Sequence, residues 1–202
     1  MTEKLTQTKD FVLDLLGVFF PPVAMAKLSK DYMSNMSNMI LYDNLKHFIQ
    51  NQDSDFEEWL KLSCNFQAES CTYYETAKML IYTINSINDD MKLSVYSNLM
   101  RAYKNEAIPL DKSSFLRLSS ILPNIFYDDL LFLKNNVTST IKVNYENSFT
   151  GMVGAQALHQ HGLLYLTNEG TVAFTRGNKE LRCTPLGLEM VRCGIDFNNY
   201  YN

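Results

Sequence analysis

The stretch that decides the fold is residues 161–187, which opens with HGLLYL and closes with TPLG. The residues just before it, 149–161, carry apolar side chains at helical spacing. Gly162 suits the position after a helix end, where glycine enters the left-handed region without penalty. The opening of this stretch therefore predicts a helix that stops at a glycine and is followed by a short apolar segment.

The closing half of the stretch predicts a hairpin and a second helix. Gly177 and Asn178 suit a two-residue hairpin loop, which would pair residues 171–176 with residues 179–184. Thr184 is a good N-cap and Pro185 a good first helical residue, and we expect Gly194 to end that helix. The predicted order is helix, β-hairpin, helix.

Upstream of this module the pattern is helical. Apolar residues recur at helical spacing as far as residue 133, and the chain has only 8 Gly and 5 Pro to interrupt them. The clearest stripe comprises Tyr73, Ala77, Leu80, Ile81, Ile84 and Ile87. We expect Asn88, Asp89 and Asp90 to cap one helix and Asp111 another, and Asp128 and Asp129 to lie in the first turn of a third.

These patterns predict a mainly α protein with two domains. The first, residues 1–136, is a helical bundle, and the second, residues 149–202, is an α+β module with one β-hairpin. Residues 137–148 are polar with some alternation, which fits a linker or an edge strand. At 202 residues with 46% hydrophobic content, the chain is long enough for a substantial core.

The second module resembles the winged-helix family. In that pattern a helix ends at Gly-Leu-Leu, a wing follows, and a Thr-Pro-Leu-Gly-like segment opens the last helix; here these are Gly162–Leu164 and Thr184–Gly187. The resemblance implies a recognition module without chemistry of its own. It indicates a non-enzymatic protein that binds a macromolecule, either another protein or a second copy of itself as a homodimer.

The candidate recognition residues follow from this resemblance. They are Arg176, Asn178, Lys179 and Arg182 around the wing, and His159 and His161 at the end of the preceding helix. A DNA-binding transcriptional regulator is the main alternative, and it predicts salt-sensitive binding to duplex DNA. The net charge is −4 and residues 149–161 contain no Lys or Arg, so the charge favours protein docking over DNA.

In the helical part, Asn88–Lys92, Leu99–Tyr103 and Phe115–Leu118 carry a weaker resemblance to small helical proteins of bacterial mobile elements, including abortive-infection proteins. That resemblance suggests a phage or mobile-element origin and a role in phage–host conflict. It leaves a membrane-acting protein as a further alternative, acting through the apolar segment from Phe11 to Lys27. The uncharged part of this segment is too short to span a bilayer as one helix, and Pro21 and Pro22 interrupt it.

No catalytic or cofactor signature stands out. His159, His161, Cys183 and Cys193 are the closest to a metal-binding set, but two histidines two residues apart on a helix point in different directions. The four cysteines form no Cys-x-x-Cys pair, so we expect reduced thiols and a cytoplasmic protein. No metal, cofactor or catalytic residue is predicted.

Overall fold

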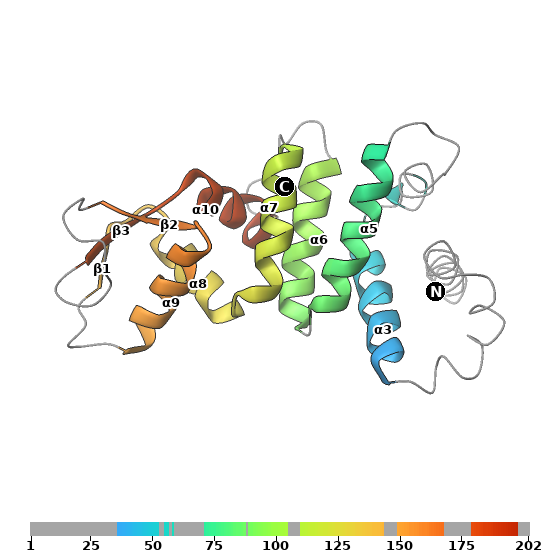
Figure 1. Cartoon of the computed structure of the whole chain (residues 1–202), viewed down its shortest axis with the longest axis horizontal. Coiled ribbons are helices and arrows are strands. Elements are labelled where there is room, and N and C mark those ends of the chain that lie inside the picture. The colour runs from blue at the N-terminus through green and yellow to red at the C-terminus, as the bar shows by residue number, and fades with distance from the viewer. Residues whose placement is uncertain are drawn as a thin grey trace. The chain divides into compact units, whose positions relative to one another are not determined.

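The structure is a computed structural model that describes residues 36–52, 55–56, 58, 71–87, 89–104, 110–143, 149–167 and 179–197. It is mainly helical with one small sheet, as predicted (Figure 1). The chain divides into two compact units, Met1–Ser97 and Asn98–Asn202. The predicted apolar segment at residues 11–27 lies outside the described residues, and so do Cys64, Arg176 and Asn178.

The first unit is built around α3 (Met36–Gln50), α5 (Cys71–Ser86) and the first part of α6 (Asp90–Lys104). The predicted stripe on α5 is confirmed from Leu80 onward, because its apolar residues there and Ile87 just after the helix are buried. Phe48 lies at the centre of this core, with its ring centroid 5.4 Å from that of Tyr96 and 5.7 Å from that of Phe56. Such aromatic contacts add specific geometry to the burial of a large apolar area.

Polar side chains bond the backbone groups at the ends of these helices. Asp89 Oδ1 accepts a hydrogen bond from the Met91 amide at 2.8 Å, so the predicted cap of α6 is confirmed. At the other side of the same connection, Asn44 Nδ2 donates to the Ile87 carbonyl at 2.8 Å. The side chain of one helix thus satisfies a carbonyl just beyond the end of another.

The second unit contains the remaining elements. They are the end of α6, α7 (Lys112–Ile121), η2 (Leu122–Asn124), α8 (Tyr127–Asn136), β1 (Ile141–Val143), α9 (Phe149–Gln160), β2 (Leu164–Leu166), β3 (Lys179–Cys183), α10 (Pro185–Glu189) and the π-helical η3 (Met190–Ile195). Asp111 caps α7 as predicted, accepting from the Ser114 amide at 3.0 Å. Asp128 and Asp129 lie in the first turn of α8, also as predicted.

The strands form an antiparallel sheet in the order β1-β3-β2. Leu181, at the middle of β3, pairs with Ile141 on one side and Leu166 on the other. Residues 171–176, the predicted partner of β3, lie outside the described residues, and β1 and β2 occupy both edges of β3 at Leu181. Residues 137–148 do contain an edge strand, β1, one of the two possibilities left open by the sequence.

One face of this sheet belongs to the core. Ile141, Leu164 and Leu181 are almost completely buried, and β1 and β2 lie against α9 (Figure 1). α9 also packs on α8, so elements on both sides of the predicted domain boundary share the second unit. The boundary itself stays a prediction.

The two ends of the stretch from residue 161 to residue 187 meet in space. Gly162 has φ 72°, in the left-handed region, as its place after α9 predicts. Thr184 caps α10, and its amide and hydroxyl both donate to the Leu163 carbonyl, at 3.0 and 3.2 Å. The prediction that Gly194 ends the last helix is wrong. Gly194 lies within η3, where the Asn98 side-chain amide donates to its carbonyl at 2.8 Å.

Candidate binding surface on the open face of the sheet

The face of the sheet turned away from α9 is polar and exposed. Side chains alternate along a strand, so Glu180 and Arg182 of β3 lie on the side opposite to buried Leu181. Their cross-strand partners are Lys142 on β1 and Tyr165 on β2. We call these four residues, with Thr140 and Thr167 beside them, the open face.

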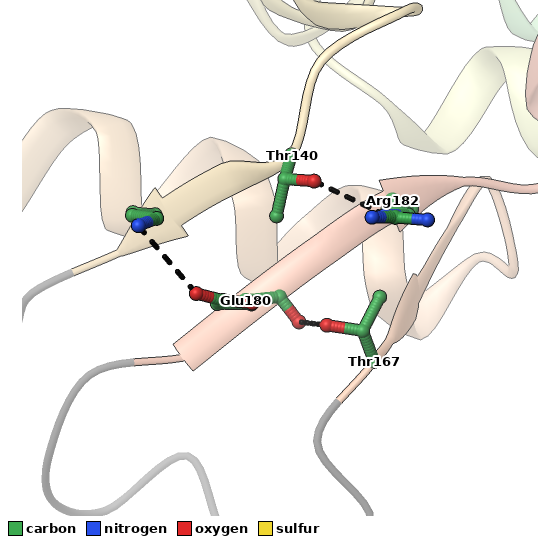
Figure 2. A network of polar contacts seen from close by, with 5 residues as sticks. Thr140, Thr167, Glu180 and Arg182 are labelled. Atoms are coloured by element: carbon green, nitrogen blue, oxygen red, sulfur yellow. Dashed lines mark hydrogen bonds and ion pairs between the residues drawn. The ribbon is translucent and has the colours of Figure 1, made fainter.

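The Arg182 side chain is hydrogen-bonded to a residue just before β1. Its Nε donates to the hydroxyl of Thr140 at 3.1 Å, across 42 positions of sequence (Figure 2). A guanidinium is planar and carries five N–H donors, so a bond at Nε orients the plane and leaves the terminal nitrogens to point elsewhere. The tertiary structure therefore presents this cation in a defined orientation at the surface.

Glu180 joins all three strands. Its carboxylate lies 3.7 Å from the Lys142 ammonium, and its backbone carbonyl accepts from the Thr167 hydroxyl at 3.2 Å (Figure 2). The Lys142 side chain is 76% exposed, so this ion pair contributes little stability. It does balance the charge of Lys142, which leaves the open face close to neutral apart from Arg182.

A hollow of about 300 Å³ opens beside Arg182. It lies between the connection from α8 to β1 and the strands β2 and β3, and its lining is Val137, Thr138, Ser139, Thr140, Tyr165, Arg182 and Cys183. Tyr165 is 44% exposed and is directly opposite Arg182 in the strand register. The hollow thus combines hydroxyl groups, one aromatic ring and one cation.

Four of the predicted recognition residues, Lys179, Arg182, His159 and His161, belong to the described part of the chain. Arg182 belongs to the open face, and Lys179 begins β3. His159, on α9, has its Nδ1 at 3.0 Å from the Leu164 carbonyl, which ties the end of α9 to the start of β2. Because a carbonyl only accepts, Nδ1 carries the proton in this contact. His161 lies in the turn beyond α9 and is half-buried.

Cys183 is unsuited to act as a nucleophile at neutral pH. Burial raises the pKa of its thiol to about 11, so the reactive thiolate is scarce. Its Sγ faces α10 and donates to the Thr184 carbonyl at 3.4 Å. In the described part of the chain, no three His, Cys, Asp or Glu side chains lie close enough together to hold a metal ion.

Sequence reasoning missed Thr140, Lys142 and Tyr165. The available signal was the alternation around Ile141, which marked an edge strand but did not say which strand it would join. Pairing with β3 requires contact across about 40 residues of sequence, as between Ile141 and Leu181, and the residues themselves do not encode that pairing locally. Once β1 is placed beside β3, these side chains share a face.

None of the described helices is both long and apolar enough to cross a lipid bilayer. No protein-family model, no curated protein and no solved structure matches this chain.

Proposed function

We propose that this protein is a non-enzymatic binding protein that docks a protein partner, or a second copy of itself, through the open face. The observation that carries the proposal is the side-by-side placement of Tyr165 and Arg182 over a polar hollow. Tyr and Arg are the residue types that most often dominate binding energy at protein interfaces. Cross-strand pairing of Tyr165 with Arg182 and the hydrogen bond from Arg182 to Thr140 already restrict these two side chains. They therefore lose less conformational entropy on binding.

The module that presents this face is proposed to be winged-helix-like. Support comes from the order of its elements, a helix followed by Gly162, two antiparallel strands, and a helix capped by Thr184. The hydrogen bonds from Thr184 to the Leu163 carbonyl, which join the start of α10 to the segment after α9, add to that support. The weaker resemblance to mobile-element proteins suggests phage–host conflict as the setting of the interaction.

Protein docking is favoured over DNA binding by the charge of the open face. Phosphate contacts from several Lys and Arg residues supply most non-specific affinity for DNA. Here Lys142 is paired with Glu180, and the chain as a whole carries a net charge of −4. A docking surface that uses one cation and one aromatic side chain needs no basic excess.

The test is site-specific photo-crosslinking in host cells. A photoreactive amino acid replaces Tyr165, and in a matched control it replaces Tyr82, an exposed tyrosine of α5. We expect a discrete protein adduct from position 165 that is absent from position 82 and is lost when Arg182→Glu is added. An adduct between two copies of the chain identifies the homodimer.

Three results would count against the proposal. They are the absence of an adduct from position 165, an adduct that forms equally well from position 82, and an adduct that survives Arg182→Glu. Crosslinking to DNA in place of protein would support the transcriptional-regulator alternative.

A further inference from the structure

We propose that the hollow beside Arg182 is an anion subsite that receives a Glu or Asp carboxylate from a segment of the docking partner. The inference rests on the proposed docking function and specifies the chemistry of the partner. Four features of the open face lead to a carboxylate.

The first feature is an oriented cation. The Nε bond to Thr140 uses one of the five guanidinium donors, and the remaining four lie on the two terminal nitrogens. Two of these can engage both oxygens of a carboxylate at once, the geometry in which Arg is strongest. Because Arg182 is already oriented by Thr140, binding costs less side-chain entropy than it would for a mobile arginine.

The second feature is the hydroxyl lining. The Thr140 oxygen accepts from Arg182, so its own hydrogen is turned away from that nitrogen and is available to a ligand oxygen. Thr138 and Tyr165 add two further hydroxyl groups to the lining. The Ser139 hydroxyl donates instead to the Asn136 carbonyl at 3.2 Å, which fixes the shape of the rim.

The third feature is the distribution of charge. The seven lining residues include one cation and no carboxylate. The neighbouring acid, Glu180, faces the ammonium of Lys142 on the side of the sheet where β3 begins. The charge of Arg182 is therefore not balanced by an acid within the hollow, and a single incoming negative charge would balance it.

The fourth feature is the number of cations in the hollow. It favours the carboxylate of a protein side chain over the phosphates of a nucleic acid. DNA affinity accumulates over many phosphate contacts, and one lining arginine supplies one such contact. A single acidic side chain against an arginine flanked by a tyrosine suits the centre of a protein interface. The occupant we infer is thus a Glu or Asp side chain within an otherwise neutral binding segment.

The test is a titration of the isotope-labelled full chain followed by nuclear magnetic resonance at constant ionic strength. The probe is a short peptide of alternating Glu and Gly, and a Gln–Gly peptide of equal length is the neutral control. We expect a saturable shift of the Arg182 Nε–H signal and of the Thr140 and Tyr165 amide signals with the acidic peptide alone. Arg182→Gln should weaken binding by roughly tenfold or more, the loss expected for a charge-assisted bond.

Matched variants separate the site from bulk charge. Arg117→Gln removes the same charge from an exposed position on α7 and should leave the affinity unchanged. Arg182→Lys keeps the charge but loses the planar fork, so it should bind more weakly than the unmodified chain and more tightly than Arg182→Gln. Because Arg182 is exposed, these variants should keep the dispersed amide spectrum of the folded protein.

The proposal is overturned if no saturable shift occurs or if Arg182→Gln and Arg117→Gln weaken binding equally. It is also overturned if inorganic phosphate or a short DNA duplex binds the hollow more tightly than the acidic peptide at the same salt concentration. The outcomes distinguish the two proposals. Crosslinking from position 165 without peptide binding refutes the anion subsite alone, and peptide binding without crosslinking refutes the docking function alone.

Discussion

Gly187 is the residue whose replacement tests the central packing contact of the second unit. A Cβ atom at this position would lie 2.3 Å from the Leu163 carbonyl oxygen and 2.8 Å from Cys183 Sγ. Real Cβ atoms essentially never approach closer than 3.0 Å, so Gly187→Ala must move α10 away from the backbone of Leu163 by about 0.7 Å or more. The obstacle is a backbone atom, which has little freedom to move.

The cost follows from what that movement disturbs. Overpacking costs about 1 to 3 kcal/mol, and weakening the Thr184 cap costs about 1 kcal/mol more. Alanine recovers up to about 1 kcal/mol of helix propensity relative to glycine. We therefore expect Gly187→Ala to lower the free energy of unfolding by roughly 1 to 3 kcal/mol.

The assay is urea denaturation of the full chain followed by circular dichroism, with Gly154→Ala as the control. Gly154 is also helical, and a Cβ there would meet the Asp129 carboxylate at 2.7 Å, the far end of a side chain that can turn aside. We expect Gly154→Ala to change stability by less than about 1 kcal/mol, because propensity and crowding oppose each other. If Gly187→Ala is as stable as the unmodified chain, the close contact between α10 and Leu163 is wrong.

Three further predictions concern single side chains. Thr184→Ala should lower the free energy of unfolding by about 1 to 2 kcal/mol, because it removes the α10 cap and a hydroxyl hydrogen bond to the Leu163 carbonyl. Chemical denaturation measures this loss of stability. Asn44→Ala should cost about 1 kcal/mol by removing the donor to the Ile87 carbonyl, with a lower urea midpoint at an unchanged slope; an unchanged midpoint would contradict the contact. Cys183 should alkylate more slowly at neutral pH than the same cysteine in urea, as measured by peptide mass mapping, because burial raises the pKa of its thiol to about 11. The raised pKa means that the folded state favours the neutral thiol. The stability that this thiol contributes is therefore complete below pH 9.0 and is lost as the pH rises toward about 11. A Cys183→Ser variant has no such thiol and should lose less stability over the same interval.

Local signals in the sequence determined most of the helices. Asp89, Asp111 and Thr184 each cap the helix that follows, and Gly162 takes the left-handed conformation, because these effects act over three or four residues. The apolar stripe ending at Ile87 is likewise a property of helical spacing alone. Such features are readable before any tertiary contact is known.

The sheet and its open face were decided by contacts between distant parts of the chain. The Gly177-Asn178 turn signal suggested a local partner for β3, but β1 and β2 pair with it instead. The free energy of a turn preference is small compared with the free energy gained by burying Ile141, Leu164 and Leu181 on one side of the sheet.

The candidate site shows the same division. The sequence by itself predicted Arg182 as a recognition residue and left residues 137–148 as a linker or an edge strand. Only the tertiary structure placed Thr140 and Tyr165 beside Arg182 and formed the hollow between them. The physical reason is that helix caps depend on near neighbours, whereas strand partners depend on which apolar faces can be buried together, and that choice involves the whole second unit.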